Sequence, residues 1–192
     1  MGRYDKLITD LKSKKIKFDK GLTSEEFDKI EKTYGICFPK SLREMYEIAL
    51  PISASFYNWR NFEEANVRII KDMLNWPLEG VLFDVEENYF WDDSWGEKPT
   101  DAIEAEKKCI EEMKKVPTLI PIYKHRYIPI VKDIDNPPIF SVYQTDVIYY
   151  GIDLENYFQI EFDFLPWEVI NDAIDKEEII IIPFWNQFCY YK

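Results

Sequence analysis

The sequence predicts a single α+β domain in which a mostly antiparallel central sheet is flanked by helices. Four short runs rich in Ile, Val, Tyr and Phe lie between residues 119 and 151, and Pro, Asn, Asp or Gly bound each of them, as they bound strands. Ahead of these runs, apolar residues recur at helical spacing. A chain of 192 residues without an internal repeat or a Gly/Ser linker suits one domain. We expect that domain over 1–192, with 1–20 as an N-terminal helical extension.

The first two helices have clear sequence signals. An apolar face within residues 4–18 consists of Tyr4, Leu7, Ile8 and Leu11. A capping box of Thr23 and Glu26 begins the second helix, and Leu22 with Phe27 forms a hydrophobic staple around it. Gly35 stands where a glycine in the left-handed conformation ends a helix.

Three further helices are predicted before the strands. One begins after Phe38–Pro39 and is stopped by Pro51. The next begins near a cap formed by Asn61 with Glu64 and is closed by Trp76–Pro77, since a proline disfavours helical geometry at the preceding residue. The last runs from residue 100 or 101 to about 115.

The four apolar runs are predicted to be strands over residues 119–123, 127–131, 139–143 and 147–151. Pro121 and Pro129 cannot donate to a ladder, which predicts strand starts, bulges or sheet edges at those positions. Asp153 then begins a short helix. The apolar run that starts the C-terminal tail, 179–192, must be buried or be covered by a partner.

Charge and composition exclude several classes of function. The net charge of −12 disfavours direct binding to nucleic acid, whose phosphates require the opposite sign, and it favours a basic protein as partner. No apolar run is long enough to span a membrane, and the N-terminal residues lack the apolar region of a secretory signal. Three well-separated cysteines are typical of free thiols in a reducing compartment, so we expect a cytoplasmic location.

The residue types needed for catalysis are scarce. His125 is the only histidine, and it stands between Lys124 and Arg126, whose positive charges disfavour the imidazolium form that a general base must adopt. No paired Cys or His spacing indicates zinc, and no glycine-rich phosphate or dinucleotide motif is present. We therefore predict no catalytic residue, no metal site and no cofactor.

One segment combines acidic and aromatic residues. Between Glu79 and Asp101 there are eight carboxylates against one cation, and Trp91 and Trp95 stand among them. Carboxylates on an exposed loop could meet Lys and Arg of a protein while an aromatic ring anchors the contact. A carboxylate-based hydrolase, a bound cation and a solvated acidic loop with buried tryptophans are the alternatives. The candidate partner-binding surface consists of Glu86, Glu87, Trp91, Asp92, Asp93 and Trp95.

A family resemblance extends over residues 20–190. The stretch 22–49 resembles the opening of SUKH superfamily domains, whose pattern of Glu, Gly, an apolar residue and Pro is matched by Glu31, Gly35, Phe38 and Pro39. Residues 75–99, 120–131 and 136–162 resemble the central and distal blocks of a bacterial branch, and 181–188 resembles its C-terminal ending. The superfamily includes a yeast cell-wall-assembly regulator and bacterial toxin-immunity proteins.

The resemblance implies a SUKH-like α+β domain and a non-enzymatic, protein-binding role. It implies an immunity protein that neutralises a partner toxin of nuclease or deaminase type by direct contact, and it carries over no catalytic residue. A regulatory scaffold that binds an endogenous protein, like the yeast relative, stays open as the alternative, with a hydrolase as the third.

Overall fold

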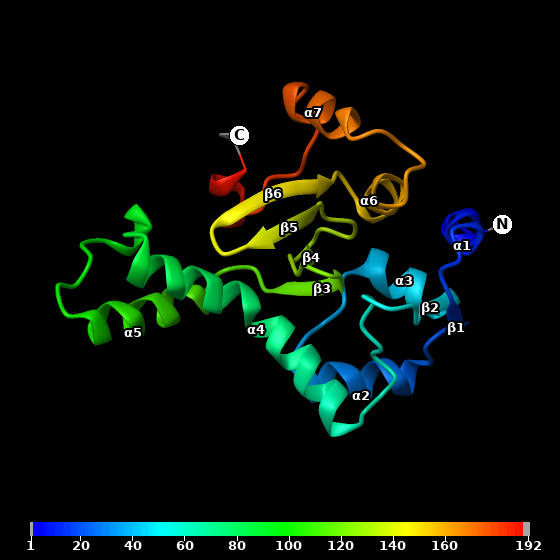
Figure 1. Cartoon of the computed structure of the whole chain (residues 1–192), viewed down its shortest axis with the longest axis horizontal. Coiled ribbons are helices and arrows are strands. Elements are labelled where there is room, and N and C mark those ends of the chain that lie inside the picture. The colour runs from blue at the N-terminus through cyan, green and yellow to red at the C-terminus, as the bar shows by residue number, and fades with distance from the viewer. Residues whose placement is uncertain (1, 190–192) are drawn as a thin grey trace.

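The computed structural model describes residues 2–189, and within this range it has the single-domain α+β fold that the sequence predicts. The described residues contain seven α-helices, two antiparallel sheets and two short 3₁₀ helices (Figure 1). The helices are α1 (Asp5–Ser13), α2 (Ser24–Tyr34), α3 (Lys40–Ile48), α4 (Glu64–Glu87), α5 (Ala102–Met113), α6 (Leu154–Glu161) and α7 (Glu168–Asp175). The 3₁₀ helices are η1 (Asp93–Trp95) and η2 (Trp185–Phe188).

The main sheet is a four-stranded meander whose strands follow one another in chain order. It consists of β3 (Leu119–Tyr123), β4 (Arg126–Pro129), β5 (Ile139–Tyr143) and β6 (Asp146–Gly151), each antiparallel to the next. All four predicted strands are present, but β4 spans 126–129 in place of the predicted 127–131, and β6 begins at Asp146 in place of 147. Pro129 contradicts its prediction, because it is the last residue of the inner strand β4, beyond the two residues that pair with β5. Pro121 lies in the edge strand β3, next to an irregularity in the register, which is where a residue without a backbone donor is tolerated.

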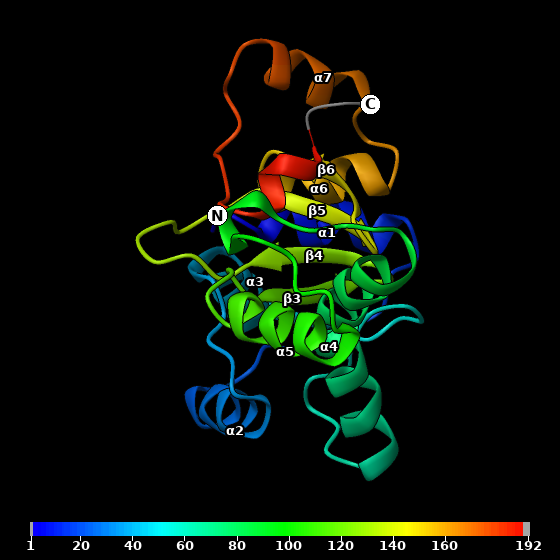
Figure 2. The same cartoon turned by 90° about the vertical axis from the view of Figure 1, so that its left-hand side faces the viewer.

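Side chains from the two faces of this sheet enter two different hydrophobic clusters. Ile120, Ile122 and Ile128 pack with α1, α2, α3 and α6, whereas Tyr127 and Phe140 pack with α7 and η2 on the other face. The sheet is therefore covered on both faces. In Figure 2 the strands are stacked in the order β3 to β6, with α4 and α5 beyond the β3 edge and α7 beyond the β6 edge.

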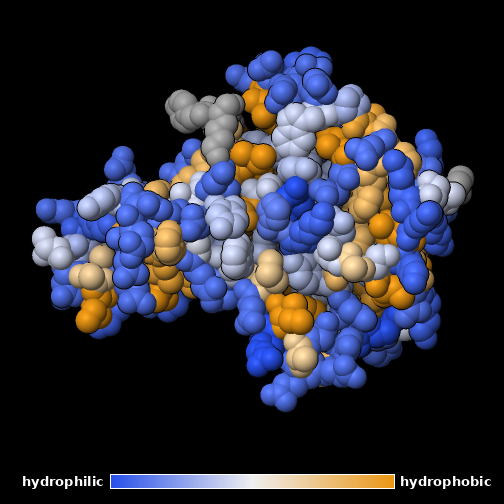
Figure 3. All heavy atoms as spheres, viewed as in Figure 1, coloured by the Kyte–Doolittle hydropathy of each residue, from blue (hydrophilic) through white to orange (hydrophobic). Residues whose placement is uncertain are grey.

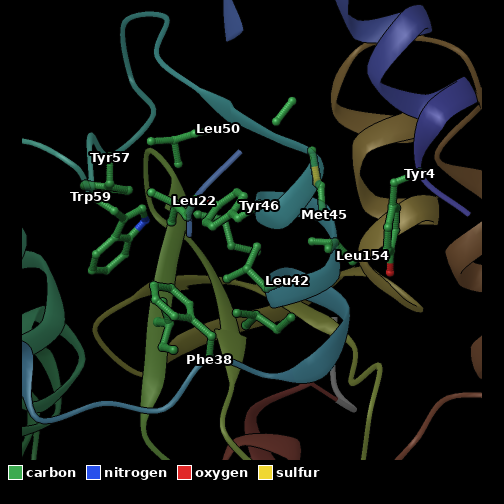
Figure 4. Packing of buried hydrophobic residues seen from close by; sticks show 14 of the residues in the cluster. Tyr4, Leu22, Phe38, Leu42, Met45, Tyr46, Leu50, Tyr57, Trp59 and Leu154 are labelled. Carbon is green, nitrogen blue, oxygen red and sulfur yellow. The ribbon is translucent and has the colours of Figure 1, made fainter. Parts of the chain in front are cut away.

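The larger cluster is built around aromatic side chains of the N-terminal half. The ring of Phe38 meets those of Tyr46 and Trp59 edge to face, with centroids 6.0 and 5.2 Å apart (Figure 4). Tyr4 and Leu11 of the first turns of the chain are also fully buried in this cluster. The segment that we expected to be a helical extension thus contributes to the main core.

The N-terminal helices begin largely as predicted. Thr23 and Glu26 form the capping box, and Gly35 ends α2 with a φ of 67°, in the left-handed region. The structure differs in two short stretches: α1 ends at Ser13, and Phe18–Lys20 is a strand, β1, paired with β2 (Ala49–Pro51). Three-residue strands carry too little alternation to be recognised from sequence.

Helix α4 contradicts the prediction that Trp76–Pro77 closes a helix. It continues through Pro77 to Glu87 and has 24 residues. Proline removes the bond to the carbonyl four residues earlier, here that of Met73, and the hydroxyl of Tyr127 donates to this carbonyl oxygen at 2.9 Å. The predicted cap is also wrong: α4 begins after Glu63, whose backbone N–H donates to the side chain of Asn61.

The C-terminal apolar run is partly buried, and burial was one of the two outcomes that the sequence predicted for it. Ile182 and Trp185 are enclosed, and the indole N–H of Trp185 donates to the carbonyl oxygen of Pro117 at 2.7 Å. Ile180 and Ile181, by contrast, are 41% and 52% exposed. The last three residues of the predicted tail, 190–192, lie outside the described residues.

Candidate functional site

The acidic-aromatic segment belongs to a projecting arm, which we define as residues 79–113. It contains the C-terminal half of α4, the connection with η1, and α5. Figure 1 shows these elements extending to one side beyond the sheet. Four of the eight carboxylates between Glu79 and Asp101 that suggested a loop therefore lie within α4, because this helix does not stop at Pro77; they are Glu79, Asp84, Glu86 and Glu87.

Asp84 fastens the arm to the sheet. Its carboxylate is 3% exposed and accepts hydrogen bonds from the backbone N–H and the hydroxyl of Thr145, at 2.8 and 2.7 Å, and from the amide of Asn88 at 2.6 Å. Thr145 lies in the turn between β5 and β6. One turn of helix earlier, a Cβ on Gly80 would lie 2.6 Å from the Cα of Gln144, so only glycine allows this close approach.

A small hydrophobic cluster stabilises the arm internally. Val81 and Val85 of α4 and Cys109 of α5 are buried together with Trp95. The indole ring of Trp95 stacks on Phe184 with centroids 5.9 Å apart, and the ring of Trp91 meets it edge to face at 5.1 Å. Burial raises the pKa of the Cys109 thiol to about 11, which keeps it protonated at neutral pH.

Trp95 must be removed from the predicted binding surface. Its side chain is only 5% exposed, because it fills the space between α4, α5 and the C-terminal segment. An exposed ring was expected because acidic residues surround it in the sequence, but sequence neighbours of a 3₁₀ helix point in different directions. Trp91 is half-buried, and its indole N–H donates to the carbonyl oxygen of Gly96 at 2.7 Å.

Four of the eight carboxylates act within the fold. Asp84 binds Thr145, Glu79 accepts from the amide of Asn75, and Asp101 caps α5. Asp92 caps η1 and also accepts from the amide of Gln187 at 2.7 Å. Burial opposes ionisation of Asp92, but the hydrogen bonds from Ser94 and Gln187 outweigh it and lower its pKa.

The other four carboxylates point to solvent. They are Glu86, Glu87, Asp93 and Glu97. None of these side chains forms an ion pair or hydrogen bond with the residues that the structure describes. Tyr89 follows the end of α4 between them and is 89% exposed. Of the predicted surface, Glu86, Glu87 and Asp93 are thus exposed and unpaired within the described range, while Asp92 and Trp91 are partly engaged.

A groove between α4 and α5 was not predicted. It measures about 670 Å³ and is lined on α4 by Leu82, Phe83 and Glu86 and on α5 by Ala102, Ile103 and Glu106. Phe83 and Ile103 are 47% and 61% exposed, and Figure 3 shows separate apolar spots on the otherwise mainly hydrophilic surface of the arm. Ile103 lies away from the buried face of α5, which Ala105 and Cys109 form.

The residues tested for catalysis are engaged in packing. His125 lies in the turn between β3 and β4, where its ring nitrogen Nε2 faces the guanidinium of Arg126. Burial lowers the pKa of His125, and the charges of Arg126 and Lys124 lower it further. The hydroxyl of Ser141 accepts from Arg126 at 3.0 Å.

A buried ion pair joins β4 to α6. The Nε atom of Arg126 lies 3.3 Å from Oε2 of Glu161, and both side chains are 10% exposed. The two atoms do not form a directed hydrogen bond, so the contact is electrostatic. Burial raises the pKa of Glu161, although Arg126 opposes this shift. The guanidinium also lies 3.7 Å from the ring centroid of Tyr150, and the group as a whole anchors the sheet to α6.

Among residues 2–189, no group of three or more His, Cys, Asp or Glu side chains is arranged to hold a metal ion. No helix in this range is both long and apolar enough to cross a bilayer.

No family model, curated protein or solved structure matches this chain.

Proposed function

We propose that this chain is a non-enzymatic, SUKH-like immunity protein that binds a basic toxin in the cytoplasm and covers the toxin's active site with the arm. The observation that carries the proposal is the group of exposed carboxylates Glu86, Glu87 and Asp93, which have no ion-pair or hydrogen-bond partner among residues 2–189 and which flank the exposed Tyr89 in the sequence. The family resemblance supports a protein partner, and the charge supports a basic one.

The charge of the chain is concentrated in the arm. Residues 79–113 carry twelve carboxylates and three cations, while the whole chain has a net charge of −12. A nuclease or a deaminase that acts on nucleic acid must hold phosphates, so its active site is lined with Lys and Arg. An acidic projection is complementary to such a site in charge, and this complementarity accelerates encounter.

The arm also has the mechanical features of a blocking element. It is a helical hairpin with its own hydrophobic cluster, fastened to the sheet through Asp84 and Gly80. A preorganised element loses little conformational entropy on binding, which favours affinity. Tyr89 provides an aromatic side chain of the kind that dominates binding energy at interfaces.

The experiment begins with the gene next to the one that encodes this chain. Its product is expressed alone and together with the chain, growth is measured, and the purified pair is analysed for a stoichiometric complex. We expect the neighbouring gene product to be toxic when it is expressed alone and harmless when this chain is present. We also expect the two purified proteins to form a complex directly. A solitary gene, or a neighbouring product that neither harms the cell nor binds the chain, contradicts immunity and favours the regulatory scaffold.

A further inference from the structure

The groove between α4 and α5 has the geometry of an incomplete helical bundle. On α4 its lining residues are Glu79, Leu82, Phe83 and Glu86, a spacing of three, four and seven that places them in one stripe of the helix. On α5, Ala102 and Glu106 are four residues apart on the facing stripe. Two helices that present such stripes to a common seam form the surface on which a third helix packs in a bundle.

Within residues 2–189, the chain fills one side of this helix pair and leaves the other open. Trp95 packs onto Val81, Val85 and Cys109, and Trp91 packs against that cluster. On the groove side, Phe83 and Ile103 remain about half exposed. Large apolar side chains that share one groove on a projecting element are typical of a binding surface.

The rim of the groove is negatively charged. Glu79 and Glu86 stand on α4, and Glu106 stands on α5. Lys98 is the cation among the lining residues, and its ammonium group donates to the carbonyl oxygen of Val85 at 2.6 Å, where it helps to satisfy the end of α4. Apolar anchors between acidic rims suit a ligand that is apolar on one side and cationic on both flanks.

We propose that this groove binds a cationic amphipathic α-helix of the partner protein, an inference that rests on the proposed function. The apolar face of that helix packs on Phe83 and Ile103, and its Lys or Arg side chains meet Glu79, Glu86 and Glu106. A second copy of this chain fits less well, because a symmetric contact places the same acidic rims against each other. The partner thus contacts the arm in two ways: the arm covers its active site, and one of its helices lies in the groove.

The groove is tested with designed peptides and the full-length chain. The probe is a labelled peptide of about 18 residues, or about five helical turns, with Leu at helical i, i+3, i+4 and i+7 positions and Lys elsewhere. A peptide with the same Leu pattern and Glu in place of Lys is the control for charge. Fluorescence anisotropy reports binding, and analytical ultracentrifugation reports whether the chain forms a dimer.

Two matched variants locate the binding site. Ile103→Ser removes an exposed anchor from the groove, and Ile69→Ser removes a similarly exposed isoleucine, 55% against 61%, from the other half of α4. We expect the cationic peptide to bind the wild type and I69S alike, and I103S to bind it about 10-fold more weakly or worse. Glu86→Gln with Glu106→Gln should reduce the salt dependence of binding. Failure of the cationic peptide to bind, equal binding of the acidic peptide, or equal binding by I103S and I69S overturns the inference, as does a dimer that buries the groove.

The product of the neighbouring gene separates this inference from the proposed function. A toxin that binds I103S as tightly as the wild type, yet loses affinity when Glu86, Glu87 and Asp93 are reversed, refutes the helix site and leaves immunity intact. Specific peptide binding in the groove combined with a neighbouring product that neither binds nor harms the cell refutes immunity and leaves the helix site intact.

Discussion

The hydroxyl of Tyr127 donates a hydrogen bond to the backbone carbonyl oxygen of Met73 at 2.9 Å, and it replaces the helical donor that Pro77 lacks. Tyr127 is fully buried in β4, 54 residues away along the chain. The bond therefore couples the middle of α4 to the central sheet. The part of α4 that follows Pro77 carries the arm, so the position of the candidate site depends on this contact.

Removing the Tyr127 hydroxyl should destabilise the protein. Tyr127→Phe leaves the carbonyl of Met73 without this donor in a partly buried place, and we expect the free energy of unfolding to fall by about 1–3 kcal/mol in urea denaturation. Tyr143→Phe, at a ring that is 58% exposed, serves as the control and should be nearly neutral. In a Pro77→Ala background the backbone N–H at position 77 is present again. The same Tyr127→Phe change should therefore lower the free energy of unfolding clearly less. Additive effects of the two substitutions would show that the bond does not compensate for the proline.

The course of α4 also shows what the sequence could and could not predict. The capping box of Thr23 and Glu26 and the four strands follow from neighbouring residues, and the structure has them. A proline is expected to end a helix when no distant group replaces its missing N–H donor. Here Tyr127, from strand β4, supplies that donor to the carbonyl of Met73. Because Tyr127 and Met73 are 54 residues apart, their contact produces no pattern among neighbouring residues of the sequence.

The candidate site was predictable in charge and composition, and its geometry was not. Glu86, Glu87 and Asp93 are exposed, as acidic residues commonly are. Trp95 is buried because α5 and Phe184 fold over it, and the groove exists because α4 and α5 lie side by side. Both facts depend on which helices pair. The stripe of Leu82, Phe83 and Glu86 becomes visible once α4 is known to extend past Pro77.

Loss of the buried carboxylate at Asp84 should loosen the arm. Asp84→Asn replaces one carboxylate oxygen by an NH2 group, so the side chain can no longer accept from both Thr145 and Asn88, and we expect a loss of about 1–3 kcal/mol in unfolding free energy. Hydrogen exchange should accelerate in residues 79–113 more than in the sheet. Asp93→Asn, on an exposed side chain, is the matched change and should leave exchange unaltered. Uniform acceleration throughout the chain would contradict a local fastening role.

Gly80→Ala tests the contact between α4 and the turn from β5 to β6. Alanine is intrinsically better in a helix than glycine by about 1 kcal/mol, so an open site would be stabilised. At Gly80 the new Cβ lies 2.6 Å from the Cα of Gln144, and backbone must move to admit it. We expect a lower midpoint of thermal unfolding. A raised midpoint would mean that the turn does not press on the helix.

The N-terminal capping box should contribute stability that depends on pH. The guanidinium of Arg60 binds the Glu26 carboxylate at 2.6 Å, and this bond, together with the backbone N–H of Thr23, lowers the pKa of Glu26 from 4.5 to about 2. A lowered pKa stabilises the fold above pH 4.5, and this contribution disappears as the pH falls from 4.5 towards 2.

Glu26→Gln removes that titration while it keeps an amide of similar shape. In urea denaturation between pH 6 and pH 2, the free energy of unfolding of the wild type should exceed that of the variant most near pH 6. This difference should shrink as acid protonates Glu26. Asp28→Asn, on the exposed face of α2, controls for the loss of a charge. A difference between wild type and E26Q that stays constant over this range would place the effect in packing and not in charge.

The central claim is that an acidic arm guides this chain onto a basic partner, and association kinetics test it most directly. Stopped-flow measurements with the neighbouring gene product compare Glu86→Lys/Glu87→Lys/Asp93→Lys with Asp28→Lys/Asp72→Lys/Asp172→Lys, which changes net charge equally at exposed positions on α2, α4 and α7. We predict that the arm variant associates about 10-fold more slowly than the wild type at low salt and loses most of the salt dependence of its association rate. The control variant should retain the wild-type association rate and its salt dependence. Equal association rates and equal salt dependence of the two variants would contradict the account.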